Sequence, residues 1–103
     1  MSVLTEFAMF PTDKGTSVST EVSKIIETIR DSGFNYKLGA MGTTIETETL
    51  AEAFEIIELC YNSIEPASKR VYASIKLDIR KGESDRLLKK IESIEKKIGN
   101  VNK

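Results

Sequence analysis

The chain has 103 residues, with 15 basic and 16 acidic side chains and a formal net charge of −1. This length suits a single domain, 1–103, and 40% hydrophobic with 30% charged residues indicates a folded globular protein. The near balance of charge argues against a nucleic-acid partner, which would require clustered Lys and Arg. The absence of histidine excludes imidazole catalysis and His-ligated metal sites.

The sequence carries no sign of export or membrane insertion. Cys60, the single cysteine, cannot form an intramolecular disulfide, which fits a reducing compartment, and we expect it to be a packing residue. The first six residues lack the basic and apolar regions of a secretory signal. No stretch approaches the roughly 18 apolar residues of a membrane span. We therefore expect a cytoplasmic protein with no membrane partner.

The first two elements are a strand and a helix. Val3–Phe10 is rich in β-favouring residues and stops at Pro11, which predicts a strand. A helix follows, in which Ser17 or Ser19 is expected to cap the first amides and Gly33 to end the last turn. Its apolar face has helical spacing and comprises Val18, Val22, Ile25, Ile26 and Ile29.

A hairpin is expected next. Phe34–Leu38 alternates apolar with polar residues, Gly39–Gly42 supplies a turn, and Thr43–Thr47 forms the second strand. Thr44 and Glu46 then share one side of that strand. The residues expected in the core are Phe34, Tyr36, Leu38 and Ile45.

The second helix begins with Thr49 and Glu52, which have the spacing of a capping box, and ends before Pro66. The apolar face expected for this helix comprises Leu50, Ala53, Phe54, Ile57, Tyr61 and Ile64.

A strand over residues 70–79 and a final helix from about Ser84 complete the chain. One side of the strand, expected to pack on the helices, carries Val71, Ala73, Ile75, Leu77 and Ile79. The other side carries Tyr72, Ser74, Lys76 and Asp78. The final helix, expected to end at Gly99, has an apolar stripe of Leu87, Leu88, Ile91, Ile94 and Ile98.

The element order predicts an α+β fold, the ferredoxin-like βαββαβ sandwich. Its four-stranded antiparallel sheet carries two helices on one face, plus a C-terminal helix. The other face of the sheet is then left open, with Thr44, Glu46, Lys76 and Asp78 on it. These residues could form a solvated polar face, a ligand site at Thr44 and Glu46, or a polar subunit interface that pairs Lys76 with Asp78. No nucleophile lies near a base, and no cluster of metal ligands is present.

Four segments together resemble the thiamine-binding protein family, small ferredoxin-like proteins formerly catalogued as an uncharacterised protein family. They comprise Glu6-Phe7 with Pro11, Gly15–Ser19, Gly33–Glu46, and Lys69–Val71 running to Ile75–Arg80. The stretch from Tyr36 to Glu46, Tyr-x-x-Gly-x-Met-Gly-Thr-x-x-Glu, is the most specific part. Two positions depart from the family pattern: Ala40 stands where Pro is frequent, and Thr47 where Gly is frequent.

The resemblance implies a protein that binds thiamine or its hydroxymethylpyrimidine part, without turning it over, at a site near a subunit interface. It further implies a homo-oligomer, a dimer of dimers, with no cofactor, no catalytic residue and no metal. The ligand-binding positions that it implies here are Ser17, Ser19, Met41, Thr43, Thr44, Glu46, Lys76 and Asp78.

An aminopyrimidine suits these residue types. Its amino group, and its ring nitrogen when protonated, can donate to a carboxylate such as that of Glu46. Nothing in the sequence offers a cradle for a pyrophosphate, so free thiamine or its pyrimidine is expected over the diphosphate. Two alternatives stay open: a structural or regulatory oligomerisation module that senses another metabolite, and a small ferredoxin-like isomerase or monooxygenase.

Overall fold

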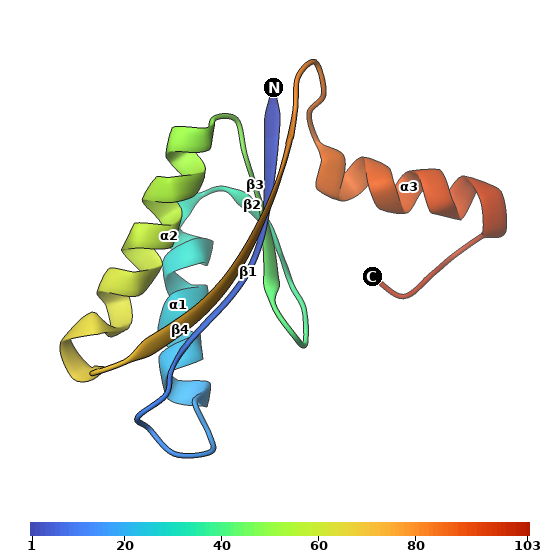
Figure 1. Ribbon diagram of the computed structural model, residues 1–103. Coiled ribbons are helices and arrows are strands. Elements are labelled where there is room, and N and C mark those ends of the chain that lie inside the picture. The colour runs from blue at the N-terminus through green and yellow to red at the C-terminus, as the bar shows by residue number, and fades with distance from the viewer.

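The computed structural model describes residues 1–103 and confirms the predicted order of elements. The elements are β1 (Ser2–Pro11), α1 (Ser19–Ser32), β2 (Asn35–Leu38), β3 (Thr43–Thr47), α2 (Leu50–Ile64), a 3-10 turn (Glu65–Ala67), β4 (Val71–Arg80) and α3 (Arg86–Ile98). The strands form one antiparallel sheet in the order β2-β3-β1-β4. Helices α1 and α2 lie on one side of the sheet and α3 on the other (Figure 1). This is the ferredoxin-like fold.

The core lies between the sheet and the pair α1 and α2. Alternate residues of β1 point to these helices, which buries Val3, Thr5, Phe7 and Met9. The main cluster of buried apolar residues comprises Phe7, Met9, Ile25, Ile29, Ile45, Ile56, Cys60 and Ile64. Cys60 is a packing residue as expected, and its burial raises the pKa of the thiol to about 12. The thiol is therefore protonated and unreactive at neutral pH.

Most helix termini lie where the sequence predicts them, including the end of α2 before Pro66 and the end of α3 at Gly99. Gly33 ends α1 in the left-handed conformation, with φ +84°. The capping box of α2 is present, since the Glu52 amide donates to Thr49 Oγ1 at 3.1 Å and the Thr49 amide to Glu52 Oε1 at 3.0 Å. The serine cap of α1 was wrong: the cap position is Val18, so Ser17 lies before it and Ser19 already within the helix.

Two expectations about core residues were also wrong. Phe54 and Tyr61 are exposed, and Ile56 and Cys60 take the buried positions of α2 instead. The buried face of α2 is turned because the helix packs against α1 as well as against β1 and β3. Leu38 is exposed because it ends the short edge strand β2, whereas Phe34, Tyr36 and Ile45 pack in or against the core.

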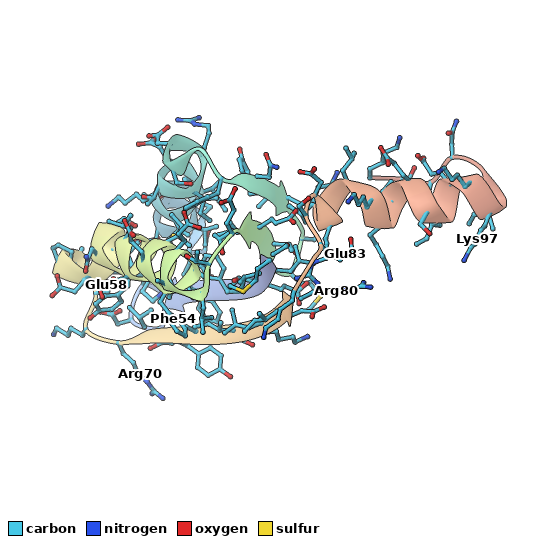
Figure 2. All side chains as sticks on the ribbon, turned by 90° about the horizontal axis from the view of Figure 1, so that it is seen from above. Phe54, Glu58, Arg70, Arg80, Glu83 and Lys97 are labelled. Carbon is cyan, nitrogen blue, oxygen red and sulfur yellow. The ribbon has the colours of Figure 1, made fainter.

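Strand β4 has the predicted two sides, but one of them is less buried than expected. Ile75 and Leu77 lie opposite Phe7 and Thr5 of β1 and therefore share the helix-facing side of the sheet. With Ile79 they remain 39–48% exposed, so the expectation that this side packs under the helices was wrong for these three residues, whereas Val71 does pack against the core. Helix α2 lies over β1 and β3, and β4 forms the edge of the sheet. Figure 2 shows Phe54 on the β4 side of α2, where it is exposed too.

None of the three helices is both long enough and apolar enough to cross a membrane.

Candidate functional site

The strand register places polar side chains in rows across the open face of the sheet. In one row, Glu46 of β3 lies beside Leu4 of β1, which lies beside Asp78 of β4. In the next row, Thr44 lies beside Glu6, which lies beside Lys76. The structure therefore brings Thr44, Glu46, Lys76 and Asp78 to one face, as the alternation in the sequence predicts.

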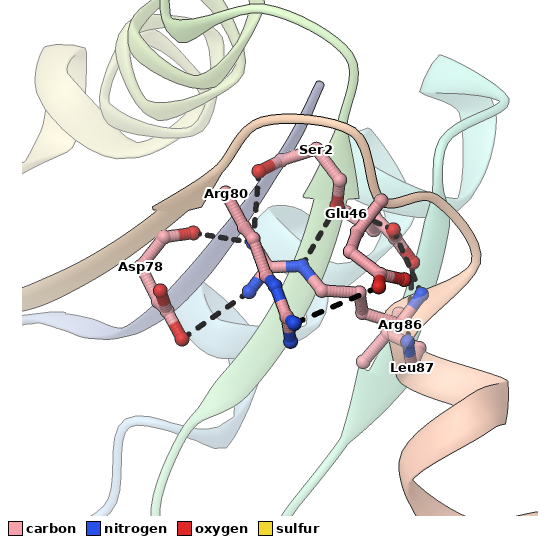
Figure 3. A network of polar contacts seen from close by, with 7 residues as sticks. Ser2, Glu46, Asp78, Arg80, Arg86 and Leu87 are labelled. Atoms are coloured by element: carbon pink, nitrogen blue, oxygen red, sulfur yellow. Dashed lines mark hydrogen bonds and ion pairs between the residues drawn. The ribbon is translucent and has the colours of Figure 1, made fainter.

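Glu46 holds the N-terminus of α3 on this face (Figure 3). Its Oε2 accepts from the amide of Arg86 at 2.9 Å and from Ser2 Oγ at 2.6 Å, and its Oε1 accepts from the amide of Leu87 at 3.2 Å. Asp85, the cap residue of α3, makes no side-chain cap of its own and has φ +52°. A carboxylate from a distant strand thus satisfies amides that a helix start leaves without partners.

Arg86 completes the attachment of α3 and is the residue that sequence reasoning missed. The residue is only 9% exposed. Nη2 donates to the carbonyl oxygens of Ser2 at 2.8 Å and Asp78 at 2.6 Å, Nε donates to Ser2 Oγ at 3.2 Å, and Nη1 lies 3.2 Å from Asp78 Oδ2. The one available signal was a cation in the first turn of a helix, where the helix dipole disfavours it unless tertiary partners compensate. We name Ser2, Glu46, Asp78 and Arg86 the α3 clamp.

The clamp sets the charge of Glu46. Partial burial opposes ionisation, but the hydrogen bonds from Ser2 and from the amides of Arg86 and Leu87 outweigh it, so the pKa of Glu46 is lowered from its ordinary value. Glu46 is therefore a carboxylate at neutral pH. A carboxylate has about four acceptor positions, so Oε1, with one bond from Leu87, can accept a further donor.

Two hollows flank the first turns of α3. The first, of about 310 Å³, lies between β2 and α3. Its lining includes two acidic residues, Glu46 and Asp85, one basic residue, Lys37, and the apolar residues Leu87, Leu88 and Ile91. This combination suits a flat ring that carries hydrogen-bond donors or positive charge. The second, of about 400 Å³, lies towards β4, and its cations include Arg80, Arg86, Lys89 and Lys90.

The other predicted ligand residues lie elsewhere. Met41 and Thr43 line a separate, mostly apolar hollow of about 240 Å³ between β1, α1 and the β2–β3 turn. Thr43 pairs with Phe7 on the helix-facing side, so the sheet separates it from Glu46. Ser17 and Ser19 are exposed at the start of α1. One subunit therefore does not bring the eight positions around a single ligand. No three His, Cys, Asp or Glu side chains are grouped so as to hold a metal ion.

The fold and this face define a small ferredoxin-like α+β protein whose polar sheet face carries a clamped helix. A family model described as "Thiamine-binding protein" matches residues 5–95, and the chain belongs to this family.

Relatives and solved structures agree with this assignment. The UPF0045 protein Mb1933 of Mycobacterium bovis is 34% identical over 96 residues, which cover 93% of this chain and 94% of the relative. A UPF0045 protein of Methanothermobacter thermautotrophicus is 32% identical over 84 residues, 81% of this chain and 85% of the relative. The crystal structure of protein MJ1052 from Methanocaldococcus jannaschii, 30% identical, superposes with a TM-score of 0.80 and covers 90% of this chain and 95% of its own.

Proposed function

We propose that this protein binds thiamine or its hydroxymethylpyrimidine part, without turning it over, in the hollow between β2 and α3. The observation that carries the proposal is an ionised carboxylate in the lining of that hollow: Glu46, whose Oε1 accepts one hydrogen bond, from the amide of Leu87. Membership of the thiamine-binding protein family supplies the ligand class. The carboxylate supplies a partner for the aminopyrimidine edge.

The surroundings of Glu46 favour a cationic, partly apolar ligand. Leu87, Leu88 and Ile91 offer one apolar wall for a ring. Asp85 adds a second carboxylate, so the acidic side chains of the hollow outnumber its single cation, Lys37. A thiazolium carries positive charge, which these carboxylates stabilise and which the basic hollow on the β4 side would repel. Free thiamine or its pyrimidine is accordingly proposed over the diphosphate, whose negative charge would lie beside Glu46 and Asp85.

The eight predicted ligand positions fit this proposal only with more than one subunit. Thr44 lies on the same face as Glu46, whereas Met41, Thr43, Ser17 and Ser19 would reach the ligand from a neighbouring copy. We accordingly propose a site near a subunit interface in a dimer of dimers, as the family resemblance implies, with Lys76 and Asp78 at an interface.

A regulatory module that senses a different metabolite is the second candidate, and one observation favours it. Glu46 already holds the start of α3, so a ligand that bonds to the same carboxylate would be coupled to the position of that helix. Under this second candidate function, ligand binding changes the position of α3. The residues that line the hollow then determine which ligand binds, and the ligand need not be thiamine.

Replacing Glu46 with Gln should weaken the binding of thiamine and hydroxymethylpyrimidine. We expect a loss of about 1.5–3 kcal/mol, or about 10- to 150-fold in Kd, because a charged acceptor becomes neutral. Isothermal titration of both ligands, with thiamine diphosphate in parallel, measures the effect. The diphosphate is expected to bind more weakly than thiamine.

The matched control is Glu6→Gln, which removes an exposed carboxylate from the same face beside Thr44 and should leave the Kd unchanged. Thermal unfolding of both variants without ligand separates a loss of binding from a loosened α3. Equal affinity of wild-type protein and Glu46→Gln would remove Glu46 from the site. A different metabolite that binds while thiamine does not would establish the regulatory module instead.

A further inference from the structure

The hollow on the β4 side of α3, of about 400 Å³, has a basic lining. Four cations and two carboxylates line it, so an excess of positive charge remains. The cations are Arg80, Arg86, Lys89 and Lys90, and the carboxylates are Asp78 and Glu83. The hollow on the other side of α3 has the opposite excess, with two acidic residues and one lysine. The two sides of this helix therefore favour ligands of opposite charge.

Arg86 contributes a guanidinium whose direction is already fixed. Its Nε and Nη2 donate to Ser2 and to the Asp78 carbonyl, and its side chain is 10% exposed. Its Nη1 forms only the ion pair with Asp78 Oδ2, at 3.2 Å (Figure 3). A guanidinium has more N–H donors than these contacts use, so Nη1 keeps an N–H for an acceptor in the hollow that Arg86 lines. A donor fixed in this way loses little freedom when it binds an anion.

The other cations are held only loosely within the chain. Glu83 lies 3.6 Å from Arg80 and 3.9 Å from Lys89, and these ion pairs join partly exposed side chains. Such pairs contribute little to stability, because water and salt screen them. No ion pair of the structure includes Lys90. These three cations can therefore turn to an external anion.

The first turns of α3 carry their cations where a helix does not favour them. The helix begins Arg86-Leu87-Leu88-Lys89-Lys90, and its first turn contains no acidic residue. The amides at a helix start create a positive potential, which attracts anions and repels cations. Glu46 neutralises part of this potential from the other side of the helix. An anion in the basic hollow would offset the rest, and departures from local preference are expected at functional sites.

We propose that the hollow between β4 and α3 binds a phosphoryl group, either as free phosphate or as part of a phosphate monoester. The free N–H of Arg86 Nη1 bonds to one phosphate oxygen, and the ammonium groups of Lys89 and Lys90 bond to the others. Bonds between these cations and a phosphate are charge-assisted, and such hydrogen bonds are the strong ones in proteins. This site is separate from the one proposed for thiamine, and its test contains no thiamine.

The test is a titration of the ¹⁵N-labelled protein with sodium phosphate, which replaces sodium chloride at constant ionic strength. We expect saturable shifts at the amides of Lys89 and Lys90 and at the side-chain Nε of Arg86. A second titration with glycerol 3-phosphate distinguishes the two sources of the phosphoryl group. Tighter binding than that of phosphate assigns the site to a monoester, and equal or weaker binding assigns it to the free anion.

Two double variants with the same change of charge separate the hollow from the rest of α3. Lys89→Gln combined with Lys90→Gln should raise the Kd for phosphate about tenfold or more, because two charged donors are lost. Lys96→Gln combined with Lys97→Gln removes the same charge from the last turn, outside the hollow, and should keep the Kd within about twofold of wild type. Circular dichroism verifies that both variants are folded.

Glu83→Gln tests the sign of the effect. This variant releases Arg80 and Lys89 from their internal partner and should lower the Kd for phosphate by about two- to fivefold. The absence of a saturable shift at millimolar phosphate would overturn the proposal. So would equal losses in the two double variants, a Kd that Glu83→Gln raises, or shifts that cluster in another part of the chain.

Discussion

Replacing Arg86 with Met is expected to lower the free energy of unfolding by about 2–3 kcal/mol. The guanidinium donates to two backbone carbonyls and to Ser2 Oγ while only 9% exposed, and hydrogen bonds from a charged group contribute about 1.5–3 kcal/mol. Met keeps most of the aliphatic length of Arg, so the loss reports the polar contacts more than the packing. Chemical denaturation measures it, and amide exchange should show α3 opening faster than β1.

Arg80→Met is the matched control for this variant. Arg80 forms only an exposed ion pair, 3.6 Å from Glu83, and exposed pairs contribute about 1 kcal/mol or less. The decrease in the free energy of unfolding caused by Arg80→Met should therefore be much smaller than that caused by Arg86→Met. Equal stability of Arg86→Met and wild type would show that the α3 clamp does not hold the helix in solution.

Replacing Ile29 with Ala should have the largest effect on stability, about 2–5 kcal/mol. Ile29 is 0% exposed and lies in the main core cluster between the sheet and the helices. The substitution removes buried methyl groups and leaves a cavity that close-packed neighbours fill only in part. Denaturant unfolding followed by circular dichroism measures the difference.

Ile98→Ala provides the comparison for Ile29→Ala, because it is the same substitution at the end of α3, where the side chain is 73% exposed. It should change the free energy of unfolding by about 0.5 kcal/mol or less. A loss at Ile98 as large as that at Ile29 would place the end of α3 in a buried environment that a single chain does not provide.

The local features of the fold were predictable because they depend on neighbours in sequence. The αL glycine at Gly33 and the capping box of Thr49 and Glu52 act within one helix turn, and both are present. The alternation in β3 correctly assigned Thr44 and Glu46 to the open face, since side-chain direction has a period of two along a strand.

Features that depend on how whole helices and strands pack together were harder to predict from the sequence. Phe54 and Tyr61 have the spacing of a buried face, but the position of α2 against α1 turns them outward. The exposure of Leu77 depends on which strands α2 covers, and this cannot be predicted from the residues around Leu77 in the sequence. Arg86 and Ser2 are 84 positions apart, so their hydrogen bonds arise only once the sheet and α3 have come together.

Glu46 has a structural role and a proposed binding role in this account. Its hydrogen bonds to the start of α3 keep the carboxylate ionised and fix its direction, which is what a preorganised acceptor for a ligand requires. Because the same carboxylate serves the proposed binding site and the start of α3, ligand binding and the position of α3 are coupled. Ligand contacts at Oε1 should therefore be felt at the amide of Leu87.

The most direct test of the proposed site is a titration of the ¹⁵N-labelled protein with thiamine, followed by amide chemical shifts. The account predicts saturable shifts at Arg86, Leu87 and Leu88, with smaller effects in the turn at Gly39–Gly42. Shifts confined to that turn and the start of α1 would place the ligand in the apolar hollow of Met41 and Thr43. The absence of any shift at millimolar thiamine would contradict the proposed function itself.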